Sequence, residues 1–342
     1  MSARAPVRLS LALQGGGAHG AFTWGALDRL LREDWIEIAA ISGTSAGALN
    51  GAAVKAGLAR GSREAARENL DWLWSQVGAA GDLRLTSWMG CLVPGPAQIS
   101  AALENSVGVS ALDAVQRAVS PYAYGPFYLN PLERIVRHMR FERIGAPEGP
   151  AFFVNTTNVR TGKIRVFDAA CVTPDALLAS TCLPTIFKAV EIDGEAYWDG
   201  GYTGNPALFP LFEQRFPDEI LIVNINPLDR PGLPRSPQEI QNRINEISFN
   251  SSLLRELRAI AFVRRLIGQG ALERGAFKNV GIHMIADDDL MASLSVATKL
   301  VPSPALLTGL RDAGARAADR FLDAHANDLG RGGTVDLAAM FA

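Results

Sequence analysis

The sequence has few cysteines and almost no net charge, and each shortage excludes a class of protein. Its three cysteines, Cys91, Cys171 and Cys182, are odd in number and lack the spacing of a metal site or a redox pair. Such usage is typical of a reducing compartment and predicts a cytoplasmic protein. The 33 lysines and arginines are balanced by 35 acidic residues, which leaves a net charge of −2. Bulk charge therefore gives no reason to expect a nucleic-acid partner.

Long apolar runs are also missing. No stretch reaches the roughly 18 uninterrupted apolar residues of a membrane-spanning helix. After Arg4 and Arg8, the first apolar run is broken by Gln14 and a run of glycines, so it lacks the core of a signal peptide. We expect any membrane contact to be peripheral. No dense group of carboxylates, or of histidine and cysteine, is present, so neither a metal nor another cofactor is expected.

The sequence does contain alternating strand and helix patterns. Hydrophobic residues make up 48% of the chain, enough for a sizeable core. Apolar strands at 7–14 and 36–42 each lead through a turn into a helix, at 20–33 and 45–59. This repeat predicts an α/β fold with a parallel sheet. Further strands are expected at 151–157, 163–167, 219–226 and 280–285, and further helices at 63–77, 173–180, 238–268 and 304–326.

A glycine-rich turn, Gly15-Gly16-Gly17-Ala18-His19-Gly20, lies between the first strand and its helix. Without side chains, its backbone N–H groups can point into open space and bind negative charge. The turn also has the G-x-G-x-x-G spacing of dinucleotide folds. However, the second strand ends in Gly43-Thr44-Ser45-Ala46-Gly47 instead of the acidic residue that binds ribose, and no Lys-Ser or Lys-Thr pair follows the glycines. The turn therefore indicates an anion site other than a nucleotide site.

The segment around Ser45 has the G-x-S-x-G pattern of a nucleophile at a sharp strand-to-helix turn. Alone the pattern is weak, because it arises by chance in roughly one chain in ten of this length. Its place at a predicted strand-helix junction gives it weight. If the first two strands are neighbours in a parallel sheet, both turns lie at the same carboxyl edge. The amides of Gly15, Gly16 and Gly17 could then face Ser45 as an oxyanion hole.

A third segment, Tyr197-Trp198-Asp199-Gly200-Gly201, places a carboxylate before two glycines. Two interpretations of Asp199 are open. Buried near Ser45, it would have a raised pKa suited to a general base at neutral pH. Alternatively it caps a turn, because Asp-Gly is common in turns.

These three motifs, in this order, resemble the patatin-like phospholipase family over about residues 9–205. Each motif alone is weak, but together they are specific. The resemblance implies a three-layer αβα sandwich with a mainly parallel central sheet, and a Ser-Asp dyad that works without histidine. Carried over by motif, Ser45 is the nucleophile and Asp199 its base. The oxyanion hole would consist of Gly15, Gly16 and Gly17.

The glycine loop departs from the family at one position. Members often carry an arginine or lysine in this loop, where the present chain has His19. A neutral imidazole supplies less positive charge, but it can donate a hydrogen bond to a phosphate. His19 is therefore a candidate substrate-binding residue, with a structural role in the loop as the alternative.

The resemblance and the composition together suggest a division of the chain. Residues 7–228 are predicted to form the patatin-like catalytic domain, and residues 229–342 a helical C-terminal extension packed on the same domain. Within the first part, residues 78–128 mix Gly, Pro and aromatic residues without clear periodicity and form an insertion. It is either a packing module or a cap over a lipid-binding cleft. The interfacial residues of such a cap would be Trp88, Met89, Leu92 and Val93.

The predicted activity is that of a lipid acyl hydrolase, a phospholipase or esterase of the phospholipase A or lysophospholipase type, which cleaves carboxylic esters through an acyl-enzyme. Its partner is a lipid or other acyl-ester substrate. Three alternatives stay open. One is a Ser-Asp-His hydrolase that uses Ser45, Asp199 and His283, in the chain order of α/β-hydrolases, on another ester such as an intracellular polyester. The others are an acyl transferase and a non-catalytic lipid-binding scaffold.

The C-terminal part contains one further pattern. The helix expected over residues 244–267 carries Arg255, Arg258, Arg264 and Arg265 among apolar residues. This pattern is typical of a solvated helix face, and less often of contact with a membrane surface.

Overall fold

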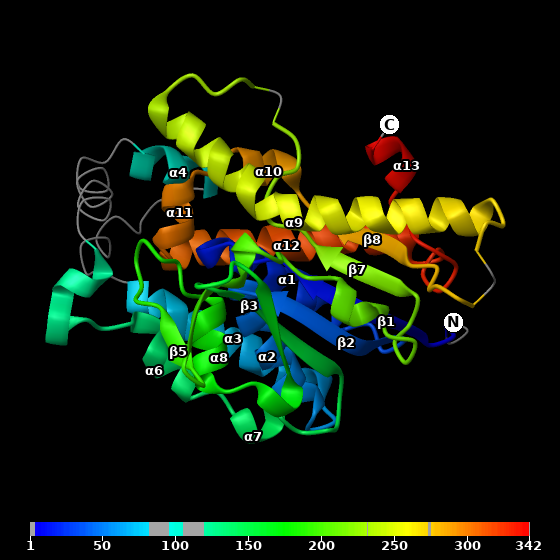
Figure 1. Cartoon of the computed structure of the whole chain (residues 1–342), viewed down its shortest axis with the longest axis horizontal. Coiled ribbons are helices and arrows are strands. Elements are labelled where there is room, and N and C mark those ends of the chain that lie inside the picture. Colours follow the sequence, from blue (N-terminus) through cyan, green and yellow to red (C-terminus); the bar gives the residue numbers. More distant parts are fainter. Residues whose placement is uncertain (1–3, 82–95, 105–119, 231, 273–274, 342) are drawn as a thin grey trace.

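A single eight-stranded sheet runs through the centre of the molecule (Figure 1). The computed structural model describes residues 4–81, 96–104, 120–230, 232–272 and 275–341. The strand order is β5-β6-β3-β2-β1-β7-β8, with β4 paired to β3. The strands are β1 (Val7–Leu13), β2 (Ile36–Thr44), β3 (Ala151–Asn158), β4 (Ile164–Asp168), β5 (Val190–Ile192), β6 (Glu195–Asp199), β7 (Glu219–Val223) and β8 (Gly281–Ile285).

The sheet is mainly parallel, as the sequence predicted. β3, β2, β1, β7 and β8 all pair in parallel. β4 and β6 are antiparallel to β3, and β5 is antiparallel to β6. The β5–β6 hairpin was not predicted. Its turn is Asp193-Gly194, where both residues have positive φ, of 53° and 78°, as expected for a two-residue hairpin loop.

Helices cover both faces of the sheet. Alternate residues of β1 point to opposite sides, because side chains of a strand alternate. Leu9, Leu11 and Leu13 join the larger apolar core, whereas Ala12 belongs to a second core that includes Leu257. The helices are α1 (Gly20–Leu30), α2 (Ala46–Leu58), α3 (Arg63–Gly81), α4 (Pro96–Glu104), α6 (Pro131–Arg137), α7 (Phe141–Ile144), α8 (Pro174–Ser180), α9 (Pro237–Gly268), α10 (Asp288–Ala292), α11 (Val296–Leu300), α12 (Pro304–His325) and α13 (Leu337–Met340). The fold is therefore a three-layer αβα sandwich, as predicted.

The long helix α9 forms the layer opposite α2 and α3 (Figure 1). It begins at a capping box, in which the Ser236 side chain accepts from the Glu239 amide and the Glu239 carboxylate accepts from the Ser236 amide. It is one continuous helix of 32 residues, and Figure 1 shows a bend near its middle. There the Ser251 hydroxyl donates to the Ser248 carbonyl at 2.9 Å, a local bond of a kind that often accompanies bending.

Residues 229–341 take part in every layer of the fold. They supply the edge strand β8, the layer helix α9, and α12, which packs closely on α1. The close approach depends on glycine, because a Cβ at Gly25 would lie 1.8 Å from the Arg311 carbonyl oxygen and one at Gly314 would lie 1.9 Å from that of Phe22. The C-terminal part thus completes the sheet in addition to packing on it.

The predicted insertion is described only in part. α3 extends to Gly81, α4 covers Pro96–Glu104, and a 3-10 segment covers Pro121–Phe127. The proposed interfacial residues Trp88, Met89, Leu92 and Val93 lie outside the described residues. Among the helices that are described, none has both the length and the apolar character needed to cross a membrane.

Candidate active site

Ser45 occupies a strained turn between β2 and α2. Its φ and ψ are 54° and −124°, a backbone conformation that L-residues rarely adopt. The flanking glycines are required by close packing. A Cβ at Gly43 would lie 2.7 Å from the Gly47 carbonyl oxygen, and one at Gly47 would lie 2.2 Å from that of Leu13. The G-x-S-x-G segment therefore forms the sharp turn expected of a nucleophile.

Asp199 ends β6 and lies at the same edge of the sheet. β6 pairs with β3 at Thr156 and β3 pairs with β2, which ends immediately before Ser45. The Asp199 side chain is fully buried. Its Oδ1 accepts from the Gly201 amide at 2.7 Å, so it does cap a turn. Its Oδ2 has no hydrogen-bond partner among the residues that the structure describes.

Burial controls the acidity of Asp199. It raises the pKa of the carboxyl from 3.8 to about 7, although the Gly201 amide and the Ser45 hydroxyl both act to lower it. An ionised carboxylate is disfavoured away from water, which explains the direction. Asp199 therefore caps a turn and also interacts with Ser45, while its role as a general base stays a prediction.

A buried network that the motifs did not reveal holds the turn at Ser45. The Ser45 amide donates to Ser180 Oγ at 2.9 Å, and Ser180 Oγ donates to the Asn155 carbonyl at 2.7 Å. The Asn155 side chain in turn donates to Thr44 Oγ1 at 2.9 Å. Ser180 and Asn155 belong to α8 and β3, so elements more than 100 residues away fix the strained turn.

The glycine loop lies against Ser45, but its three amides are not equivalent. A Cβ at Gly15 would lie 2.6 Å from Ser45 Cβ, so a side chain at this position would displace the serine. The Gly15 amide donates to Asn205 Oδ1 at 2.7 Å and is therefore occupied. The Gly16 and Gly17 amides donate no hydrogen bond within the described part of the chain. Of the three predicted oxyanion donors, the structure leaves these two available.

His19 packs inside the fold next to α11. Its Nε2 lies 2.7 Å from Thr298 Oγ1, and because that hydroxyl donates to the Ser295 carbonyl at 2.6 Å, the histidine nitrogen is the donor to it. Burial, followed by the positive charge of Lys299, holds the pKa of His19 well below its usual 6.5. Nδ1 is buried and has no partner among the described residues. These contacts fit the structural role left open by the sequence.

A positive charge reaches the glycine loop from a distant part of the chain. A Cβ at Gly17 would lie 2.3 Å from the Lys299 carbonyl oxygen. Lys299 Nζ donates to Asn226 Oδ1 at 2.7 Å, and Nδ2 of the same Asn226 side chain donates to the Gly15 carbonyl at 2.9 Å. Burial lowers the pKa of Lys299 to about 8, against the opposing effect of Glu246. No sequence motif pointed to Lys299 or Asn226.

His283 does not join Ser45 and Asp199. It lies on β8, which is separated from β2 by β1 and β7. The ring is fully buried, with Nε2 at 3.0 Å from Glu219 Oε2 and Nδ1 at 3.1 Å from Thr334 Oγ1. Both nitrogens are thus engaged elsewhere, and the alternative of a Ser-Asp-His triad is not supported by this placement.

Two hollows are present on the described surface. One, of about 270 Å³, lies between α9 and the 3-10 segment η5 (Phe209–Phe212) and is bordered by Ile260 and Phe277. The other, of about 480 Å³, lies between α3 and α12 and is bordered by Trp74 and Leu307. Neither is lined by Ser45 or Asp199. Within the described ranges, no group of three or more histidine, cysteine or carboxylate residues could hold a metal ion.

Comparison with known proteins gives one family match. The family model for patatin-like phospholipase matches residues 11–212, more than half of the chain and the whole span from Gly15 to Asp199. No curated protein matches the sequence.

Solved structures are similar at low identity. VipD from Legionella pneumophila is 13% identical, with 94% of this chain and 68% of that chain covered and a TM-score of 0.43. ExoU in its heterodimeric complex with SpcU, from the type III secretion system of Pseudomonas aeruginosa, is 19% identical, with 98% and 74% covered and a TM-score of 0.33. A second structure of the type III effector ExoU is 15% identical, with 94% and 53% covered and a TM-score of 0.33.

Proposed function

Because the chain belongs to the patatin-like phospholipase family, we propose that it hydrolyses lipid esters with a dyad of Ser45 and Asp199. The observation that carries this proposal is the pairing of two unusual groups. Ser45 is held in a strained turn, and the Asp199 carboxyl, on which the Ser45 hydroxyl acts, is buried with a pKa raised to about 7. A base with a pKa near the working pH combines availability with proton affinity.

The first half of the reaction forms an acyl-enzyme. Asp199 takes the Ser45 proton as Oγ attacks the ester carbonyl, and the carbonyl oxygen becomes an oxyanion. The Gly16 and Gly17 amides would donate to it, and the N-terminus of α2, which begins at the next residue, adds a favourable dipole. When the tetrahedral intermediate collapses, the bond to the alcohol breaks and Asp199 returns the proton to the departing oxygen.

The second half releases the acid. A water molecule attacks the acyl-enzyme carbonyl while Asp199 accepts one of its protons, and the same amides hold the second oxyanion. Collapse breaks the bond to Ser45 Oγ, which recovers the proton from Asp199. The products are a free fatty acid and an alcohol. In the phospholipase A and lysophospholipase reactions that we propose, the alcohol is a lysophospholipid or a deacylated headgroup.

The test compares the wild type with Ser45→Ala and Asp199→Asn. Release of fatty acid from short-chain p-nitrophenyl esters and from mixed phospholipid vesicles is followed by mass spectrometry. We expect each substitution to lower kcat by at least about 1000-fold, as for other residues that act as a catalytic unit. The vesicle products identify the bond that is cleaved. A fluorophosphonate probe should label the wild type at Ser45.

Matched controls remove the same groups at exposed positions. Ser75 and Asp34 both lie on the surface, and the variants Ser75→Ala and Asp34→Asn should retain full activity. Substantial turnover in Asp199→Asn would show that this carboxylate is not the base. A wild type that releases nothing from either substrate and remains unlabelled would instead favour a non-catalytic scaffold.

A further inference from the structure

One face of α9 exposes a row of apolar and basic side chains, which we call the α9 stripe. At 3.6 residues per turn, its members fall within about 80° of the helix circumference. Ile244 and Ile247 are each 54% exposed and Phe262 is 51% exposed. The stripe consists of Ile240, Ile244, Ile247, Arg255, Arg258, Phe262 and Arg265. Its first half is apolar, and its second half is basic with one aromatic ring.

The charges of the α9 stripe are not neutralised. Arg255 bonds to Ser251 of its own helix and to no other described residue, and Arg265 lies over the Phe262 ring with 5.3 Å between the guanidinium carbon and the centroid. Arg258 stacks in the same way on another ring. None of the three arginines pairs with a carboxylate in the part of the chain that is described. Such a row attracts anions even on a chain whose net charge is −2.

The acidic residues of α9 are all kept off the stripe. Glu246 is buried and pairs with Arg230 at 2.7 Å. Glu256 points into the fold, where it accepts from the amides of Leu208 and Phe209 at 2.9 and 2.8 Å. Glu239 is used in the capping box at the start of the helix. The exposed face therefore has one sign of charge.

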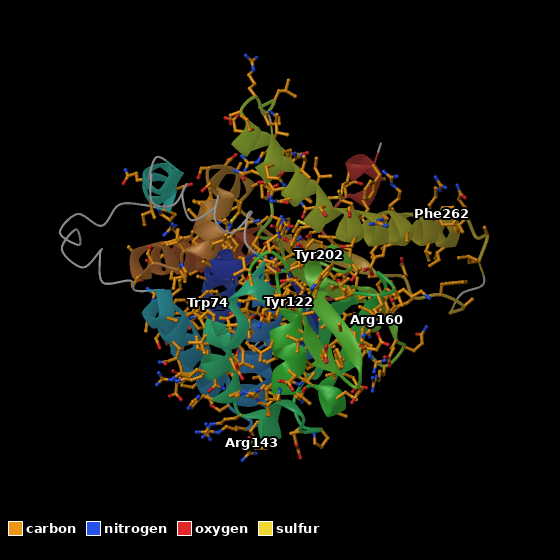
Figure 2. The ribbon with its side chains drawn as sticks, turned by 60° about the vertical axis from the view of Figure 1, so that its left-hand side comes forward. Trp74, Tyr122, Arg143, Arg160, Tyr202 and Phe262 are labelled. Carbon is orange, nitrogen blue, oxygen red and sulfur yellow. The ribbon has the colours of Figure 1, made fainter. Side chains whose placement is uncertain are left out.

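The opposite side of α9 is attached to the catalytic loops. The Phe249 ring lies 5.3 Å from that of Tyr202, three residues after Asp199, and Figure 2 shows Tyr202 beside this helix and Phe262 further along it. Ser252 Oγ accepts from the Asn205 amide at 3.1 Å. The helix thus has the catalytic loops on one side and the α9 stripe on the other.

We propose that the α9 stripe docks the protein on a lipid surface that carries anionic headgroups. A helix with an exposed apolar row and arginines, and without acids on that face, has the composition of helices that lie in the membrane interface. The isoleucines would enter the boundary between headgroups and acyl chains, and the arginines would bind phosphates. The inference rests on the proposed function in taking lipid as the substrate, and it adds the surface through which aggregated lipid is held.

The test measures vesicle binding separately from catalysis. All proteins carry Ser45→Ala, so that the vesicles stay intact, and co-sedimentation is measured with phosphatidylcholine vesicles with and without phosphatidylglycerol. We expect the parent to prefer the anionic vesicles. The triple variant Arg255→Gln/Arg258→Gln/Arg265→Gln should bind them on the order of 100-fold more weakly at low salt, because each arginine near an anionic surface contributes about fivefold.

A matched variant removes the same charge from the other side of the molecule. Arg60, Arg140 and Arg143 are exposed, and Figure 2 shows Arg143 far from α9. Their triple replacement by glutamine should leave binding unchanged. The variant Ile244→Ser/Ile247→Ser should weaken binding by about tenfold or more through loss of apolar burial. Circular dichroism and thermal unfolding establish that each variant is folded.

Defined results overturn the proposal. It fails if the parent does not bind anionic vesicles, or if the α9 triple variant binds as well as the matched variant. It also fails if the α9 substitutions convert a dimer into a monomer in sedimentation, because the stripe would then contact a second copy of the chain.

Failure of the docking proposal can be told apart from failure of the catalytic one. With Ser45 restored, the α9 variants should hydrolyse a soluble short-chain ester at the wild-type rate. Charge-dependent vesicle binding without any esterase activity would support the docking proposal and refute the proposed catalysis. Normal esterase activity without vesicle binding would support the proposed catalysis and refute the docking proposal.

Discussion

Replacing Asp199 by asparagine should abolish ester hydrolysis and stabilise the folded protein at alkaline pH. Burial raises the pKa of this carboxyl from 3.8 to about 7. The folded protein therefore holds the proton more tightly than the unfolded chain does, and stability contributed by this group falls as pH rises from about 4 to about 7. At 1.36 kcal/mol per pKa unit, the cost of ionising Asp199 is at most about 4 kcal/mol at pH 8.

Asparagine has almost the same shape and keeps an oxygen that can accept from the Gly201 amide, but it carries no charge. We expect Asp199→Asn to raise the free energy of unfolding by about 1 to 4 kcal/mol at pH 8 and by almost nothing near pH 4. Urea unfolding of both proteins at several pH values measures this. The difference between variant and wild type isolates Asp199 from other groups such as Glu256, whose pKa is also raised by burial to about 7.

The pH dependence of catalysis should report the ionisation of the same carboxyl, that of Asp199. For a base that must be ionised, kcat/KM of the wild type on a soluble ester should fall about tenfold per pH unit below pH 7. The argument is refuted if Asp199→Asn is less stable than the wild type at pH 8, or if its gain in stability does not depend on pH. Asp34→Asn at an exposed position is the control and should change neither quantity.

Three other substitutions test the supports of the site. Ser180→Ala removes the acceptor of the nucleophile's amide and should lower both kcat and the free energy of unfolding, the latter by about 1–3 kcal/mol, as measured by kinetics and urea unfolding. Gly47→Ala places a methyl 2.2 Å from the Leu13 carbonyl oxygen and should abolish folding or activity, which expression and esterase assays would show. His283→Asn breaks the buried contact with Glu219 and should cost about 3 kcal/mol of stability without changing kcat.

Each of these expectations has a contrary result. Gly268→Ala, where an added Cβ meets nothing within 4 Å, is the control for the glycine substitution, and equal behaviour of the two would show that the turn tolerates a side chain. Unchanged stability and kcat in the Ser180 variant would remove it from the supports of the nucleophile. A folded His283 variant with a large loss of kcat would favour the Ser-Asp-His triad again.

The parallel part of the fold could be predicted because its signals are local. Apolar runs with turn residues at their ends predicted a strand at six positions, and the structure has a strand at each. The β5–β6 hairpin was missed because β5 has only three residues and acidic residues interrupt the segment that forms the two strands. The turn residues Asp193-Gly194 were the available signal.

The site could be predicted only in outline. The motifs identified Ser45, Asp199 and the glycine loop as candidates, because the glycines and the acidic residue form patterns that can be recognised in the sequence. Which amide is free depends on Asn205, whose side chain occupies the Gly15 amide. That contact joins residues 190 positions apart, and a single sequence contains no signal for such a pairing.

The attachment of α9 also bears on the order in which the protein is synthesised. The family match ends at residue 212, so a growing chain contains every catalytic motif well before α9 exists. Yet the Gln14 side chain, next to the glycine loop, donates to Asn250, and the Asn205 amide donates to Ser252. A nascent chain that has emerged from the ribosome only up to β7 therefore contains the motifs but lacks the contacts that α9 makes with Gln14 and Asn205. These contacts can form only after α9 has been synthesised.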